Sequence, residues 1–81
     1  SKPHPEIYLK TSNKLDILPS NCIVFEDSFP GIESARNAGM KIIALTTTHY
    51  KKDLAKADLV INDFTEINLD KIISIFQRPP K

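Results

Sequence analysis

Two adjacent carboxylates, Glu26 and Asp27, follow directly after a short apolar run at residues 22–25. The run is rich in β-branched and aromatic residues, so it predicts a strand that is buried on both faces. Acids at the carboxyl end of a buried parallel strand lie where α/β sheets place their ligands. Neighbouring carboxylates repel each other, so a bound cation would stabilise them, and oxygen-only ligands suit Mg²⁺. The alternative is a solvated loop in which Asp27 or Ser28 caps the next helix.

Helices and strands are expected to alternate around these acids, in the order α-β-α-β-α-β-α. The expected ranges are, in chain order, a helix at 6–18, a strand at 22–25, a helix at 30–38, a strand at 42–45, a short helix or turn at 50–56, a strand at 59–61 and a helix at 68–77. Gly39 follows the second helix, where a left-handed C-cap is expected. Short apolar strands that alternate with helices indicate a parallel sheet with right-handed crossovers, and therefore an α/β fold.

The composition is that of an ordinary globular chain and allows one domain at most. The 81 residues are 41% hydrophobic and 26% charged, with a formal net charge of +1, which gives no support for a nucleic-acid-binding face. No apolar run approaches the roughly 20 residues that a membrane span needs. The single cysteine, Cys22, is expected to be a small buried hydrophobic residue, since one thiol cannot form a disulfide framework. A reducing, cytoplasmic setting fits this pattern.

Three strands form a smaller sheet than such folds usually carry, and two of them must be edge strands. The chain also starts without an initiator Met and without a signal-peptide pattern. We therefore expect a fragment of a larger fold. An apolar strand at residues 22–25 would then have a free edge that pairs with the remainder of its own protein or with a second copy.

Two separate motifs in the sequence carry a family resemblance. They are KPHPEIY at residues 2–8 and VFEDS at residues 24–28, the second followed by Gly31-Ile32 and by AGM at residues 38–40. Together they resemble the C-terminal half of a haloacid dehalogenase-like phosphohydrolase, with its Rossmann-like three-layer α/β/α core. The most similar subgroup is that of β-phosphoglucomutase and its phosphatase relatives, and the resemblance covers essentially the whole chain.

The resemblance implies roles for four residues. Lys2 matches the third-motif lysine, which in the family contacts the transferring phosphoryl group, and Ser1 beside it is a weaker substrate-binding candidate. Glu26 and Asp27 match the fourth-motif acids that hold Mg²⁺. These roles are chemically reasonable, because phosphoryl transfer needs cations on the equatorial oxygens of the phosphoryl group. The expected substrate is a small phosphorylated metabolite.

Other parts of the family pattern have no match in the sequence. No position matches the first motif, which carries the nucleophilic Asp that becomes the aspartyl-phosphate, or the second-motif Ser/Thr, and there is no cap domain. Asp58 and Asp63 lie in the wrong part of the pattern. The resemblance therefore implies that residues 1–81 form the C-terminal part of the core domain, with half of an active site and no nucleophile, and that this chain alone is inactive.

Two kinds of function stay open at this point. One is a fragment of a Mg²⁺-dependent phosphatase or phosphomutase, and the other is a non-catalytic α/β interaction domain. A receiver-type phosphoacceptor fails on motif order, because Lys2 precedes every acid. A nucleotide-binding fold is disfavoured because no Gly-rich phosphate loop is present.

The remaining distinctive residues have structural interpretations. His4 and His49 have no metal-ligand spacing and are expected in loops, and Ser28 is expected to cap a helix rather than to bind a ligand. Threonines 46–48 could line the site, although a strand-end role is favoured. The residues expected in the core or on the apolar stripe of the last helix are Tyr8, Phe64, Leu69, Ile72, Ile73 and Phe76.

Overall fold

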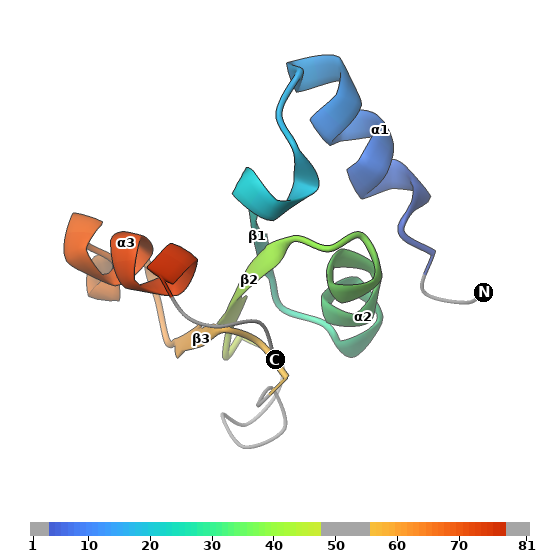
Figure 1. Cartoon of the computed structure of the whole chain (residues 1–81). Coiled ribbons are helices and arrows are strands. Elements are labelled where there is room, and N and C mark those ends of the chain that lie inside the picture. The colour runs from blue at the N-terminus through green and yellow to red at the C-terminus, as the bar shows by residue number, and fades with distance from the viewer. Residues whose placement is uncertain (1–3, 48–55, 78–81) are drawn as a thin grey trace.

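A three-stranded parallel sheet forms the centre of the molecule (Figure 1). The computed structural model describes residues 4–47 and 56–77. The strands are β1 (Ile23–Glu26), β2 (Lys41–Leu45) and β3 (Leu59–Ile61), arranged in the order β1-β2-β3. Val24 lies opposite Ile42, and Ala44 lies opposite Val60. The predicted α/β fold with a parallel sheet is confirmed, and each strand lies within one residue of its predicted range.

Within the described residues, three α-helices pack around the sheet: α1 (Glu6–Leu15), α2 (Phe29–Asn37) and α3 (Leu69–Gln77). Short 3-10 helices, η1 (Pro19–Asn21) and η3 (Phe64–Glu66), precede β1 and follow β3. The second helix is followed by Gly39 with a positive φ of 79°, as predicted. The element expected at residues 50–56 lies outside the described residues, apart from Lys56.

The first helix ends three residues earlier than the sequence pattern predicts. Asp16 adopts a left-handed conformation with φ 57°, and the Ile17 N–H bonds to the Ser12 carbonyl oxygen at 3.0 Å. This capping arrangement stops the helix before Pro19 can. Leu18, which fits the helical spacing of the apolar residues, is extended and largely exposed.

The sheet separates two hydrophobic layers because successive side chains of a strand point to opposite faces. Ile42 and Ala44 of β2 face α2 and join a buried cluster that also contains Val24 and Ile32. Ile43 faces the other way and packs with Ile61 and with Ile75 of α3. Figure 1 shows α1 and α2 on one side of the sheet and α3 on the other. The two layers thus pack against opposite faces of the same three strands.

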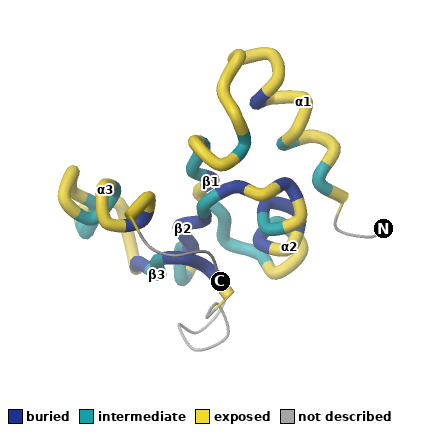
Figure 2. Tube along the Cα trace, in the orientation of Figure 1, coloured by how far each residue is buried: buried dark blue, intermediate teal, exposed yellow. Residues whose placement is uncertain are grey.

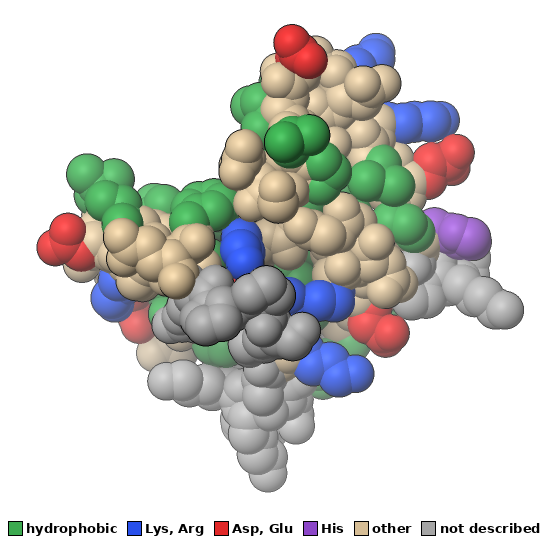
Figure 3. Space-filling view, viewed as in Figure 1, with side chains coloured by type: hydrophobic (Ala, Val, Ile, Leu, Met, Phe, Trp, Pro, Cys, Tyr) green, Lys and Arg blue, Asp and Glu red, His purple; other side chains and the backbone are tan. Residues whose placement is uncertain are grey.

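The predicted apolar stripe on α3, at Leu69, Ile72, Ile73 and Phe76, does not contain the side chain that the structure buries. Ile75 is fully buried, whereas Leu69 is 70% exposed and Ile73 and Phe76 are about two-fifths exposed. The helix turns the face with Ile72 and Ile75 towards the sheet, so the face with Leu69, Ile73 and Phe76 points away from it. Figure 3 shows the resulting green surface over α3. Positions on the two faces are too similar in hydrophobicity for periodicity to choose between them.

The prediction of a first strand buried on both faces is also wrong. Val24 is buried beneath the helices, but Phe25 on the opposite face is 42% exposed and packs against Phe64, whose ring lies 5.3 Å away between centroids. Phe64 itself is 61% exposed, which contradicts its predicted place in the core, and Cys22 is half-buried. The cause is the strand order: β1 is at the edge of the sheet, and α3 covers only part of this face (Figure 2).

No helix within the described ranges is long and apolar enough to cross a membrane.

Candidate active site at the carboxyl edge of the sheet

Asp27 lies at the edge of the sheet where the carboxyl ends of the strands meet. It directly follows β1, and Thr47 follows the neighbouring strand β2 by two residues. The Thr47 hydroxyl donates a hydrogen bond of 3.0 Å to Asp27 Oδ2. Beside this pair, the Thr46 hydroxyl donates to Asn62 Oδ1 at 2.6 Å, which links the ends of β2 and β3. The carboxyl edge is therefore a line of oxygen-bearing side chains, as the α/β topology predicts.

Glu26 points into the protein, unlike Asp27. Its Oε1 accepts hydrogen bonds from the backbone N–H groups of Asp27 and Ser28, at 3.0 and 3.3 Å, and from the Ser28 hydroxyl at 3.1 Å. Its Oε2 accepts a hydrogen bond of 2.9 Å from the Tyr8 hydroxyl of α1. Four donors thus hold one half-buried carboxylate at the junction of β1, α1 and α2.

Gly31 makes the space for this carboxylate. A Cβ atom at position 31 would overlap Glu26 Cγ, Cδ and Oε2. Ser28 completes the arrangement as the N-cap of α2, because its Oγ accepts a hydrogen bond of 3.2 Å from the Gly31 N–H while donating to Glu26. The predicted capping role of Ser28 is confirmed, and the residues just before α2, Asp27 and Ser28, supply the backbone donors to the carboxylate.

Tyr8 has an altered acidity because of this environment. Burial, followed by its hydrogen bond to Glu26 and by the negative charge of that carboxylate, raises the pKa of Tyr8 from 10.0 to about 12. The phenol therefore keeps its proton and acts as a donor throughout the physiological pH range. Tyr8 is half-buried, as the sequence predicts. It packs against the buried cluster that contains Val24, Ile32 and Ile42, which we call the first core cluster.

The acids at this edge fit part of a magnesium site. Within residues 4–47 and 56–77, no group of three or more His, Cys, Asp or Glu side chains could hold a metal ion. Mg²⁺ needs no such group, since it commonly takes one or two carboxylates, with waters and substrate phosphate as its other ligands. The oxygen-only chemistry of Asp27 and its surroundings suits that ion. Lys2 and Ser1, the other predicted site residues, lie outside the described residues, as does His49.

Other polar residues have structural roles. The buried Asp58 accepts a hydrogen bond of 2.7 Å from the Ile42 N–H and lies 3.7 Å from the Arg36 guanidinium. Asp63 and Glu66 form a capping box around η3. The sequence suggested threonines 46–48 as possible site residues but favoured a strand-end role, whereas the structure places the Thr47 hydroxyl on Asp27.

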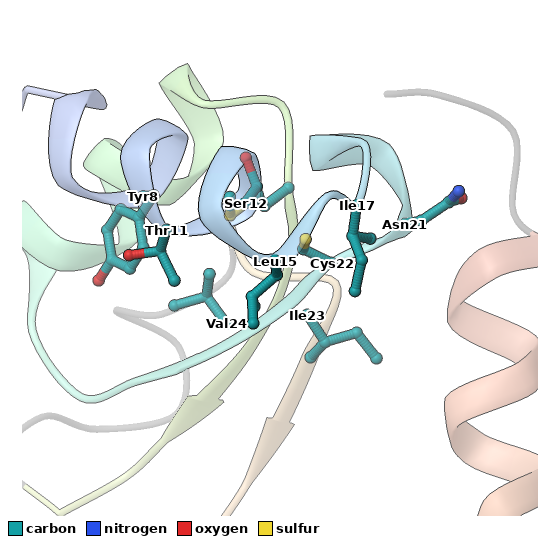
Figure 4. Close-up of a pocket in the computed structure, with 10 residues that line it drawn as sticks. Tyr8, Thr11, Ser12, Leu15, Ile17, Asn21, Cys22, Ile23 and Val24 are labelled. Atoms are coloured by element: carbon teal, nitrogen blue, oxygen red, sulfur yellow. The ribbon is translucent and has the colours of Figure 1, made fainter.

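A groove of about 430 Å³ lies between α1 and β1. Figure 4 shows its lining, which includes Leu15 from α1, Ile17 after it, and Cys22, Ile23 and Val24 on the β1 side. Most of the lining is apolar. In the described part of the chain β1 pairs with β2 alone.

Comparisons with known proteins agree with this architecture. The family described as "Haloacid dehalogenase-like hydrolase" matches residues 1–45. The validoxylamine A 7'-phosphate phosphatase of Streptomyces hygroscopicus subsp. limoneus is 46% identical over 66 residues, which cover 82% of this chain and 31% of the phosphatase.

Two solved structures share the fold. A family IA, variant 3 hydrolase from Entamoeba histolytica superposes with a TM-score of 0.89 at 37% identity, over 96% of this chain and 36% of the other. The β-phosphoglucomutase of Clostridium difficile superposes with a TM-score of 0.80 at 31% identity, over 95% of this chain and 33% of the other. The chain thus spans about a third of the length of each of these three proteins.

Proposed function

Because the chain belongs to the haloacid dehalogenase-like hydrolases, we propose that it supplies part of the active site of a phosphoryl-transfer enzyme. The enzyme is a phosphatase or phosphomutase, and its substrate is a small phosphorylated metabolite. The observation that carries this proposal is the position of Asp27 at the carboxyl edge of the parallel sheet, held by Thr47 from the neighbouring strand. The phosphatase and phosphoglucomutase relatives support the reaction class.

Asp27 is the proposed ligand of a Mg²⁺ ion, which when bound would neutralise charge on the phosphate. Thr47 orients the Asp27 carboxylate towards the edge. Glu26 is the second acid of the proposed site, and direct ligation by it would require some of its four hydrogen bonds to open. Lys2 is proposed to bind the phosphoryl group, with Ser1 as a weaker contributor, because an ammonium stabilises the equatorial oxygens.

The attacking group is proposed to lie outside these 81 residues. No residue here matches the family's nucleophilic Asp, so residues 1–81 are proposed as the C-terminal part of a core domain whose other part forms the aspartyl-phosphate. A reducing, cytoplasmic setting is part of the same proposal. The competing function, a non-catalytic interaction domain, predicts that neutralising Asp27 leaves every measurable property except stability unchanged.

The free edge of β1 is proposed to pair with another protein segment, from the remainder of the same protein or from a second copy. In the described part of the chain β1 has a partner strand on one edge only, and an apolar strand with an open edge is a template for strand addition. Sedimentation of the 81-residue chain across a dilution series tests this. A well-dispersed monomer that unfolds cooperatively at micromolar concentration would contradict the proposal.

The activity itself is tested with the full-length gene product and p-nitrophenyl phosphate. Asp27→Asn should lower Mg²⁺-dependent hydrolysis at least about a hundredfold, because a metal ligand contributes several kcal/mol of charge stabilisation. Asp16→Asn is the matched control, since Asp16 is an exposed acid at the end of α1 and Asn tolerates its left-handed backbone. Equal activity of the two folded variants would contradict the proposed role of Asp27.

A further inference from the structure

The Tyr8 side chain is linked by hydrogen bonds, through Glu26, to the loop that carries Asp27. It lies on α1, whereas its hydrogen-bond partner Glu26 ends β1, 18 positions along the chain. Glu26 Oε1 in turn accepts hydrogen bonds from the backbone N–H groups of Asp27 and Ser28. Tyr8, Glu26 and the loop at residues 27–28 therefore form one continuous chain of hydrogen bonds, which we call the Tyr8 tie.

The tie is a specific construction, because three separate features serve it. Gly31 leaves the space that the Glu26 carboxylate occupies, although a glycine within a helix is less favourable than an alanine. Ser28 donates to Glu26 while it caps α2. Burial of the Tyr8 ring against the first core cluster fixes the position of its hydroxyl. A carboxylate held both from α1 and from the loop at residues 27–28 orders the backbone that it binds.

We propose that Tyr8 is a positioning residue, which fixes Glu26 and through it the β1–α2 loop and the direction of the Asp27 carboxylate. The inference rests on the proposed function in so far as Asp27 binds Mg²⁺. In this arrangement Glu26 contributes to the site by accepting a hydrogen bond from the backbone N–H of Asp27 and so fixing the position of that residue. The tie also couples α1, which follows the segment with Lys2, to the loop with Asp27.

The test compares Tyr8→Phe with the wild-type full-length gene product. Phe keeps the ring that packs in the core and removes only the hydroxyl. Ser74→Ala is the control, because it removes a hydroxyl that bonds within α3 to the Lys71 carbonyl oxygen and touches no part of the tie. Amide hydrogen exchange of Asp27 and Ser28 is read by NMR, Mg²⁺ affinity is read by calorimetry, and global stability is read by thermal unfolding.

The expected result is a local change. In Tyr8→Phe, exchange at Asp27 and Ser28 should rise about fivefold, the effect of one lost hydrogen bond, while amides in the middle of α2 keep their rates. Mg²⁺ affinity should fall by a similar factor, and Ser74→Ala should change neither quantity.

Unchanged exchange at Asp27 and Ser28, or equal acceleration throughout the protein, would overturn the proposal. If Tyr8→Phe does not fold, Gly31→Ala displaces Glu26 from the other side and must give the same local change. Wild-type protein that binds no Mg²⁺ would contradict the proposed function, whereas the exchange rates would still decide the role of Tyr8.

Discussion

The hydroxyl of Tyr8 donates a hydrogen bond of 2.9 Å to Oε2 of Glu26, and this bond joins the first helix to the end of the first strand. The two adjacent acids, Glu26 and Asp27, therefore have different roles. Glu26 turns inward and binds the loop backbone, whereas Asp27 lies at the edge of the sheet with Thr47. We therefore expect different results from variants that disturb the two carboxylates.

Gly31→Ala is expected to displace Glu26 without unfolding the protein. The added methyl group would overlap the Glu26 side chain, which is flexible and can rotate away, while alanine favours the helix by about 0.5–1 kcal/mol. Activity of the full-length protein should fall severalfold while its melting temperature holds. Unchanged kinetics in Gly31→Ala would contradict the role assigned to the Glu26 carboxylate.

The Tyr8 hydroxyl should lose its proton at a higher pH in the folded chain than in the unfolded chain. The 81 residues contain two tyrosines, so in the 81-residue chain with Tyr50→Phe the tyrosinate absorbance reports Tyr8 alone. Its midpoint is expected near 12 in the folded protein and near 10.0 in urea. Because the unfolded chain loses this proton first, the tyrosine's contribution to the unfolding free energy is complete below pH 10 and is lost between pH 10 and 12. A folded-state midpoint near 10 would show that Tyr8 is neither buried nor bonded to Glu26.

Ser28→Ala is expected to affect stability more than chemistry. It removes the N-cap of α2 and one donor to Glu26, and the loss of a cap costs about 1 kcal/mol. Thermal unfolding should show the loss, and the residual activity should exceed that of Asp27→Asn by at least about tenfold, the ratio that follows from a difference of 1.4 kcal/mol. Similar kcat values in the two folded variants would indicate that the acids are structural.

The fold was predictable from the sequence to the extent that local signals determine it. Ser28 and Gly39 mark the two ends of α2 by chemistry that depends on few neighbours. The exposure of Phe25 was not predictable, because it follows from the position of β1 at the edge of the sheet. Periodicity also placed Leu18 in the first helix, although the left-handed Asp16 ends it earlier.

The site was predictable in its residue types and not in its geometry. The position of Asp27 directly after an apolar strand predicted its place at the edge of the sheet. The inward direction of Glu26 depends on its side-chain torsions and on Tyr8, which is distant in sequence. Thr47 belongs to a different strand, and only the pairing of β1 with β2 brings it to Asp27.

The 81-residue chain by itself is expected to have no phosphatase activity. Lys2 and the two acids can stabilise charge, but the family's nucleophilic Asp has no match here. Turnover of p-nitrophenyl phosphate with Mg²⁺ measures this. Activity that survives repurification and disappears in Asp27→Ala would contradict the expectation.

Calorimetric titration of the full-length gene product with Mg²⁺ tests the central claim, that Asp27 at the carboxyl edge of the sheet binds the metal. We expect saturable binding by the wild-type protein and by Asp16→Asn, and a loss of Mg²⁺ affinity of at least about tenfold in Asp27→Asn. Equal Mg²⁺ affinity in folded wild-type and Asp27→Asn protein would contradict it.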